Sequence, residues 1–192
     1  MKSLFIATRN AGKAREFAQI LPDWEIQTLL DLPDIPDVLE DGATFEENAQ
    51  KKALEISAHT ESFVLADDSG LEVDILNGAP GVHSARYAGE PKNDARNLQK
   101  LLDELKTTPE EKRGAQFRCV LALAQNKKIL FTVEGVCRGK IAFHPAGKNG
   151  FGYDPIFSPD GYTQTFAELS PDAKHRLSHR GKAISQLKQK MP

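Results

Sequence analysis

The chain has 192 residues, of which 40% are hydrophobic and 27% are charged, and its formal net charge is −2 at pH 7. This composition is typical of one packed domain, predicted here to span residues 1–192 with two lobes, and the charge argues against nucleic-acid binding, which needs a clearly basic surface. The first apolar run, residues 4–7, is too short for a signal peptide or a membrane span, so we expect a cytoplasmic protein with no membrane partner.

The N-terminal segment is predicted to be a strand, a polar loop and a helix. Residues 2–8 are largely apolar, and residues 14–21 form an amphipathic helical pattern. Thr8, Asn10 and Lys13 fall where the strand gives way to the helix. Backbone N–H groups and the positive helix end favour a phosphate at such a place. An ordinary surface loop would explain the same residues.

The next segment is acidic, whereas the C-terminus is basic. Residues 23–47 contain nine acidic residues and no Lys or Arg, and residues 173–192 contain six Lys or Arg and no acid. This separation indicates either two solvated faces, or one lobe that holds a cation and another that holds an anion. A capping box at residues 44–47 and helical apolar spacing predict a helix over residues 44–59.

A pair of acidic residues follows an apolar strand. Residues 63–66 are predicted to be that strand, residues 67–70 (Asp-Asp-Ser-Gly) its end, and residues 71–76 a further strand. Paired carboxylates repel each other unless a cation or a proton lies between them. Mg²⁺ binds one or two carboxylates and completes its shell with water and phosphate oxygens, so Asp68 and Glu40 would form a half-shell. The alternative is an acidic turn that only ends the strand.

The second half of the chain completes an α/β pattern. Asn93 is predicted to cap a helix, residues 115–124 and 128–138 to form an antiparallel hairpin, and Ser170 to begin the last helical segment. Because helices interleave with βαβ-like units and a hairpin, we expect an α/β fold around a mixed, strongly twisted sheet.

The two cysteines are predicted to be reduced. A hairpin that turns near Asn126 would place Cys119 opposite Glu134 rather than opposite Cys137. Reduced cysteines agree with a cytoplasmic protein.

Residues 150–157 (Gly-Phe-Gly-Tyr-Asp-Pro-Ile-Phe) place aromatic rings and a carboxylate on a glycine-hinged backbone. Pro155 biases Asp154 toward an extended conformation, so the rings of Phe151 and Tyr153 are predicted to project from a loop. A purine base is flat and could stack on such rings. The alternative is a pair of loop aromatics packed into the core.

Five spaced motifs together resemble the inosine triphosphate pyrophosphatase family, also called the Ham1 family. They are Thr8-x-Asn10-x-x-Lys13, Glu40 before Gly42-x-Thr44-Phe45-x-Glu47-Asn48-Ala49, Asp67-Asp68-Ser69-Gly70-Leu71, residues 150–157, and Ser178-His179-Arg180. The resemblance spans nearly the whole chain in order. It implies Mg²⁺-dependent hydrolysis of non-standard purine nucleoside triphosphates (ITP, dITP and XTP) to the monophosphate and pyrophosphate. It also implies a homodimer with an elongated sheet and two lobes with the active-site cleft between them.

The resemblance also implies a role for each motif residue. Asp68 would be the general base and, with Glu40, a metal ligand. The phosphates would be held by Thr8, Arg9, Asn10, Ala11, Gly12 and Lys13, supported by Lys52. Ser69 would contact the substrate, and the base would be held by Phe151, Gly152, Tyr153, Asp154, Lys174, His179 and Arg180. Lysine and arginine only donate hydrogen bonds, so the base site should favour a 6-oxo purine over adenine.

Other functions are open on the sequence alone. A Maf-type nucleotide pyrophosphatase would share the architecture but act on other nucleotides. Residues 150–157 and Ser178-His179-Arg180 favour the first family. A nucleotide sensor without turnover would not need the acidic residues Glu40, Asp67 and Asp68. A structural interaction protein would not need the separation of charge.

Overall fold

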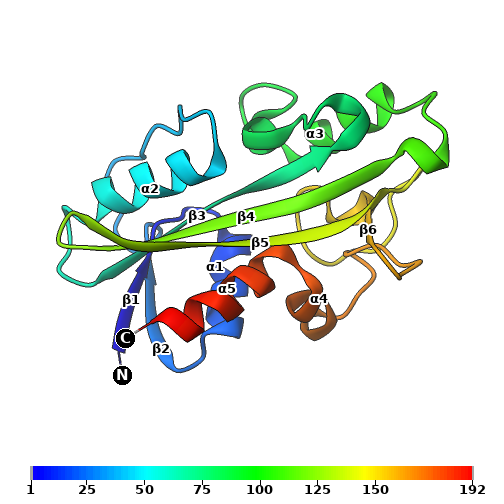
Figure 1. The fold of residues 1–192 in the computed structure, drawn as a ribbon. Helices are drawn as coiled ribbons and strands as arrows, with labels where there is room; N and C mark the ends of the chain where they lie inside the picture. Colours follow the sequence, from blue (N-terminus) through cyan, green and yellow to red (C-terminus); the bar gives the residue numbers. More distant parts are fainter. Residues whose placement is uncertain (1, 192) are drawn as a thin grey trace. The chain divides into compact units, whose positions relative to one another are not determined.

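The computed structural model describes residues 2–191, which form a mixed sheet with flanking helices (Figure 1). The six-stranded sheet has the order β2-β1-β3-β4-β5-β6. The strands are β1 (Lys2–Ile6), β2 (Trp24–Thr28), β3 (Phe63–Val73), β4 (Gly114–Gln125), β5 (Lys128–Ile141) and β6 (Phe157–Pro159). The α-helices are α1 (Ala11–Ile20), α2 (Phe45–Ile56), α3 (Asp94–Glu104), α4 (Pro171–Leu177) and α5 (His179–Lys190). The predicted α/β fold around a mixed sheet is confirmed. Among residues 2–191, no helix combines the length and apolarity that a membrane crossing requires.

The chain divides into two compact units, and it passes from one unit to the other within the long strands. The N-terminal unit comprises Met1–Asp68, Cys119–Gly135 and Ala183–Pro192, and the central unit comprises Ser69–Arg118 and Val136–Lys182. Strands β3, β4 and β5 therefore contribute residues to both units. A single domain with two lobes and a cleft stays a prediction.

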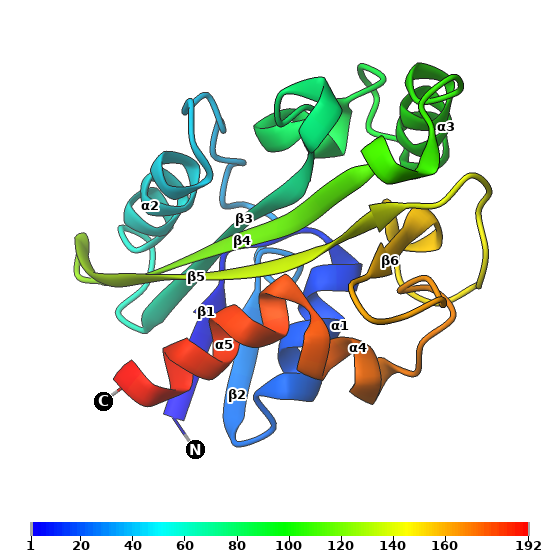
Figure 2. The ribbon, with the colours of Figure 1, turned by 45° about the vertical axis from the view of Figure 1, so that its right-hand side comes forward.

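Parallel strands organise the N-terminal unit. β1 pairs in parallel with β2, from Lys2 opposite Trp24 to Ile6 opposite Thr28, and also with β3. Because parallel neighbours need a crossover connection, α1 joins β1 to β2 as a βαβ unit. Figure 2 shows α1 and the C-terminal part of α5 on one face of these strands and α2 on the other. β2 was not among the predicted strands, and its side chains are exposed at Glu25 and Gln27.

β3 corrects the predicted arrangement of the acidic pair. Residues 67–70 do not end a strand, because β3 continues to Val73 and is followed by a 3₁₀ turn at Asp74–Leu76. Successive side chains of a strand point to opposite faces. The Asp67 and Asp68 side chains therefore point to opposite faces of β3, and the prediction of two carboxylates that repel each other across one shared cation was wrong.

Helix boundaries also differ from the prediction. α1 begins at Ala11 rather than residue 14, because Asn10 serves as its N-cap. The cap of α2 at Thr44 is confirmed, although this helix ends at Ile56 rather than residue 59. The basic C-terminal segment is two helices, which Ser178 separates in an extended conformation.

The predicted hairpin is confirmed. β4 and β5 are neighbours in the sheet, and Asn126 and Lys127 connect them with φ values of 50° and 60°. Positive φ at both central residues is the geometry of the tight turns that favour hairpins. Cys119 and Cys137 are both free and buried, as predicted.

The central unit has its own apolar core. Leu101 of α3 and the C-cap residue Leu105 pack with residues of β3, β4 and β5 and with the segment that follows β5. Phe117 of β4 contacts Phe157 edge-on at 4.8 Å and stacks on Phe166 at 5.9 Å between ring centroids. This cluster supports the segment that carries residues 150–157.

Candidate active site

The loop between β1 and α1 is shaped by two local hydrogen bonds. The Asn10 side-chain oxygen accepts from the Lys13 N–H at 3.0 Å, and the Asn10 N–H donates to Thr8 Oγ1 at 3.1 Å. Ala11 and Gly12 occupy the first turn of α1. A helix supplies no acceptors for the N–H groups of its first turn, and its N-terminus carries partial positive charge. Such a turn suits a phosphate oxygen.

The Arg9 side chain reaches acceptors in the segment that follows β2, and its predicted phosphate contact stays a prediction. Its guanidinium donates to the backbone oxygen of Leu29 at 2.6 Å and to Asp37 Oδ1 at 2.6 Å. It also donates to the backbone oxygen of Ile35. The Arg9 side chain therefore holds the segment that follows β2. Sequence could not show this, because these acceptors lie 20 or more residues away.

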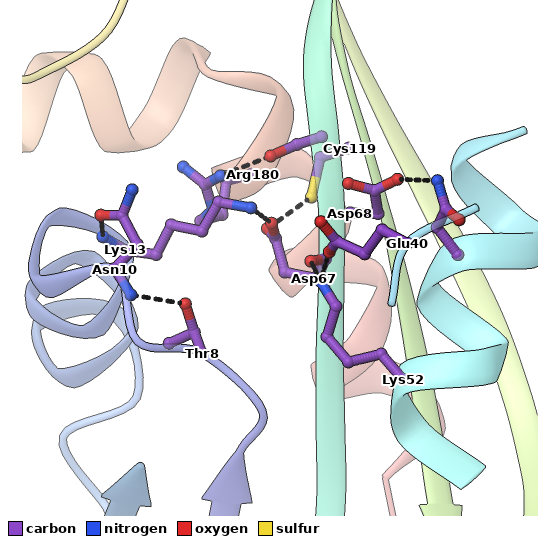
Figure 3. A network of polar contacts seen from close by, with 11 residues as sticks. Thr8, Asn10, Lys13, Glu40, Lys52, Asp67, Asp68, Cys119 and Arg180 are labelled. Carbon is purple, nitrogen blue, oxygen red and sulfur yellow. Dashed lines mark hydrogen bonds and ion pairs between the residues drawn. The ribbon is translucent and has the colours of Figure 1, made fainter. Parts of the chain in front are cut away.

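Lys13 reaches from α1 to the face of β3 that carries Asp67 (Figure 3). Its ammonium forms an ion pair with Asp67 Oδ1. The second Asp67 oxygen accepts a hydrogen bond from the thiol of Cys119, on neighbouring β4, at 3.2 Å. The Asp67 side chain is 0% exposed and that of Lys13 is 16% exposed. A buried carboxylate thus holds this lysine next to the α1 N-terminus.

Asp68 faces α2 on the opposite side of β3. Its Oδ2 accepts a hydrogen bond from the Asn48 side-chain nitrogen at 3.0 Å, and the Asn48 oxygen accepts from the Gly42 N–H at 2.7 Å. The Gly42 N–H fixes which end of the amide is the acceptor, so Asn48 can only donate to Asp68. A Cβ at Gly42 would lie 2.7 Å from the Asn48 oxygen, so the contact needs glycine there.

The surroundings raise the pKa of Asp68 to about 6. Burial is the main cause, because it disfavours the charged form, and the nearby Glu40 carboxylate acts in the same direction. Lys13, Lys52 and the hydrogen bond from Asn48 oppose this shift. A carboxyl group with this pKa is well placed to accept a proton near neutral pH.

Lys52 is not the solvated lysine that its position alone would suggest. It is 9% exposed, forms an ion pair with Glu40, and donates to the backbone oxygen of Asp67 at 2.9 Å. Figure 3 shows Lys52 reaching from α2 toward Glu40 and β3.

The acidic oxygens near Asp68 fit a hard cation. Glu40 raises the pKa of Asp68 by electrostatic repulsion. A divalent cation between the two carboxylates would relieve that repulsion, and oxygen is the ligand that Mg²⁺ prefers. Within residues 2–191, no three His, Cys, Asp or Glu side chains gather as a metal-binding group.

The central unit carries the remaining predicted site residues. Arg180 is 2% exposed and donates to Ser69 Oγ at 2.9 Å. The ring of His179, which is 4% exposed, stacks on Phe117 with the centroids 4.7 Å apart and the planes 11° apart. Neither side chain lies on a solvated basic face.

Two carboxylates hold the loop that bears Phe151. Asp154 Oδ2 accepts from the Phe151 N–H at 2.8 Å and from the Lys174 ammonium at 2.6 Å. Asp94, at the start of α3, accepts from the Gly152 N–H at 2.8 Å. Lys174 Nζ lies 5.1 Å, and Arg180 Cζ 5.9 Å, from the centroid of the Phe151 ring. Two cations therefore lie close to one aromatic ring.

The glycine hinges of this loop are confirmed, but two details of the prediction were wrong. Gly150 and Gly152 have φ values of 77° and 61°. Asp154 is not extended but begins a 3₁₀ turn, Asp154–Ile156. Tyr153 does not project from the loop, because the residue is 5% exposed within the core and its hydroxyl donates to the backbone oxygen of Ser84 at 2.8 Å.

The predicted residues thus fall into two groups. The N-terminal unit gathers Lys13, Glu40, Lys52 and Asp68, and the central unit gathers Phe151, Asp154, Lys174 and Arg180 with Ser69. Sequence reasoning assigned no role to Asn48, Cys119 or Asp94. Only Asn48 gave a signal, because it lies four residues before Lys52 on one helix face.

Comparison with known proteins agrees with this assembly of motifs. The Ham1 family model matches residues 4–190. A dITP/XTP pyrophosphatase of Geobacillus kaustophilus is 53% identical over 189 residues, covering 97% of this chain and 93% of that protein. A dITP/XTP pyrophosphatase of Shouchella clausii is 50% identical over 190 residues, covering 98% and 96%. The solved Ham1 protein of Staphylococcus aureus is 44% identical, with a TM-score of 0.85 over 98% of this chain and 97% of that chain. The chain therefore belongs to the Ham1 family.

Proposed function

We propose that this protein hydrolyses non-standard purine nucleoside triphosphates (ITP, dITP and XTP) to the nucleoside monophosphate and pyrophosphate. The observation that carries this proposal is the pair of buried cations, Lys174 and Arg180, at the ring of Phe151. The names of the relatives point to the same substrates.

The base would stack on Phe151 and accept hydrogen bonds from the two cations. Lysine and arginine offer donors and no acceptor. The 6-oxo oxygen of hypoxanthine or xanthine accepts such a bond, whereas adenine presents an amino group there. A site that requires one hydrogen-bond partner can discriminate by about 10⁴-fold.

The phosphates would bind at the N-terminal unit. The first turn of α1 offers backbone N–H groups, and Lys13 and Lys52 offer positive charge close to Asp68. The water oxygen attacks the α-phosphorus, and the bond from the α-phosphorus to the oxygen that bridges the α- and β-phosphates breaks. The two lysines would neutralise the charge that develops on the departing pyrophosphate.

Asp68 would take the proton of the attacking water. Its raised pKa makes it a better proton acceptor than an exposed aspartate, and Asn48 keeps one of its oxygens in a fixed direction. General base catalysis contributes about 10²- to 10⁴-fold in rate.

We also propose that Glu40 and Asp68 hold Mg²⁺. The ion, when bound, supplies positive charge that polarises the phosphate oxygens. Glu40, which forms an ion pair with Lys52, would have to give up part of that contact to bind the metal. A homodimer, which rests on the family resemblance, and a cytoplasmic location, with which the two free cysteines agree, complete the proposal.

A panel of nucleotides tests the substrate class. We expect kcat/KM for ITP, dITP or XTP to exceed that for ATP by at least about 10²-fold, within the range that such sites reach. Pyrophosphate release is measured for ITP, dITP, XTP, ATP and GTP at one Mg²⁺ concentration. Comparable values for ITP and ATP would refute the proposal.

The Asp68→Asn substitution tests the general base. It keeps the shape of the side chain but removes the proton acceptor, so kcat should fall by about 10²-fold or more while the protein remains folded. Asp74→Asn is the matched control, because Asp74 belongs to the central unit and 52% of its side chain is exposed. Retention of more than about a tenth of the rate would move the role to another residue.

A further inference from the structure

Asp67 and Cys119 lie among the proposed phosphate-binding residues, yet the proposed reaction gives neither a role. Asp67 is 1% exposed, its Oδ1 pairs with the Lys13 ammonium, and its Oδ2 accepts from the Cys119 thiol at 3.2 Å. Its backbone oxygen accepts from Lys52 at 2.9 Å. One buried residue thus contacts both lysines that would neutralise pyrophosphate (Figure 3).

We propose that Asp67 is a positioning residue that holds the Lys13 ammonium at the phosphate site, and that the Cys119 thiol keeps the Asp67 carboxylate in place. The inference rests on the proposed function, because it takes Lys13 to be a phosphate ligand. The two neighbouring aspartates would then have different roles, because Asp68 acts on the substrate and Asp67 acts through Lys13.

Strand geometry argues against a metal role for Asp67. Alternate residues of a strand share a face. Asp67 lies on the face of Leu65, which packs with α1 and α5, whereas Asp68 contacts Asn48 of α2. A metal held by Asp68 and Glu40 would therefore lie on the other face of β3 from the Asp67 carboxylate.

Lys13 needs a fixed anionic partner for two reasons. It lies in the first turn of α1, where the helix dipole disfavours a cation. Its long side chain also has many rotamers, which a bond to a buried carboxylate restricts. An ammonium has three N–H groups, so a lysine can bond a carboxylate oxygen and a phosphate oxygen together.

The thiol suits its place beside Asp67. Cys119 is 0% exposed on β4, the strand next to β3. A thiol is a weak, neutral donor. It can satisfy the second carboxylate oxygen without adding a competing cation, so the negative charge of Asp67 remains available to Lys13.

A double-mutant cycle tests whether Asp67 acts through Lys13. The variants are Lys13→Met, Asp67→Asn and the double substitution, each checked for folding by circular dichroism and thermal unfolding. The readouts are the inhibition constant of inorganic pyrophosphate and the Mg²⁺ concentration at half-maximal rate. Interaction between two sites appears as a departure from additive effects.

We expect Lys13→Met and Asp67→Asn each to raise the pyrophosphate inhibition constant by about tenfold, the loss of roughly one good charge-assisted contact. In the Lys13→Met background, Asp67→Asn should add less than about twofold, because the lysine it positions is gone. The Mg²⁺ requirement of Asp67→Asn should stay within about twofold of wild type, since Asp67 does not ligate the metal.

The contrary outcomes separate this inference from the proposed function. If the two effects multiply in the double variant, or if Asp67→Asn raises the Mg²⁺ requirement about tenfold as a lost ligand would, the positioning role is wrong. If Lys13→Met itself changes neither KM nor the inhibition constant, the phosphate role of Lys13 in the proposed function fails instead.

Cysteine variants provide a second test should Asp67→Asn not fold. Cys119→Ala should weaken pyrophosphate inhibition in the wild-type background but not in the Lys13→Met background. Cys119→Ser retains a donor and should recover most of that loss. Cys137→Ala, at the other buried free cysteine, is the matched control. Equal effects of Cys119→Ala and Cys137→Ala would overturn the thiol's part.

Discussion

Removal of the Lys174 ammonium should strongly destabilise the central unit. Lys174 and Asp154 are 7% and 5% exposed at their side chains, and Nζ lies 2.6 Å from Oδ2. Lys174→Met preserves the approximate length of the side chain but removes its charge. Asp154 would then be a buried carboxylate without this cation. Breaking a buried pair in this way costs about 3–5 kcal/mol.

The expected shift is large enough to measure by thermal unfolding. For a chain of this size, each kcal/mol lowers Tm by about 2–4 °C, so Lys174→Met should lower Tm by about 6–20 °C. Arg138→Met is the matched control, because Arg138 and Asp74 form an ion pair in the same unit with side chains 47% and 52% exposed. Pairs at the surface contribute about 0–1 kcal/mol, so this control should lose less than about 4 °C.

A second substitution identifies the cause of the loss. In Lys174→Met/Asp154→Asn, the amide oxygen can still accept from the Phe151 N–H, but no carboxylate charge is left buried. Part of the lost Tm should therefore return, while KM for ITP stays raised because the base site still lacks its cation. A Tm for Lys174→Met within the range of the control would refute the reasoning.

Three further predictions concern other contacts. Phe151→Ala should raise KM for ITP by about 5- to 150-fold, the equivalent of about 1–3 kcal/mol of base stacking, and unchanged kinetics would assign the ring to packing. Gly42→Ala places a Cβ 2.7 Å from the Asn48 oxygen. We therefore expect kcat to fall and the protein to lose about 1–3 kcal/mol of stability. An unchanged kcat would mean that Asn48 does not orient the proposed base, Asp68. Arg138 hydrogen-bonds Asp74 and thereby lowers its pKa. The stability difference between wild type and Arg138→Met should therefore be fully present above the ordinary aspartate pKa of about 3.9 and should disappear as the pH falls below that value. Tm values of both proteins across acidic pH would test this.

The sequence determined those features that depend on neighbours in the chain. Thr44, Asn93 and Ser170 cap their helices as predicted, because a cap needs only a side chain that reaches an N–H two or three residues ahead. The hairpin follows from two β-rich runs joined by a short polar turn, in which Asn126 is a residue type that tolerates positive φ. The five motifs also indicated the family, because their order and spacing are properties of the chain itself.

Other features were decided only by the tertiary structure. Two successive acidic residues proved to serve opposite faces because β3 continues through them, and the pairing of neighbouring strands sets where a strand ends. Tyr153 entered the core because Ser84, far away in the sequence, offers its hydroxyl an acceptor. Arg9 likewise found its acceptors beyond β2. In each case, the side chain's role depends on burial and on partners brought close only by folding, and local pattern carries no information about them.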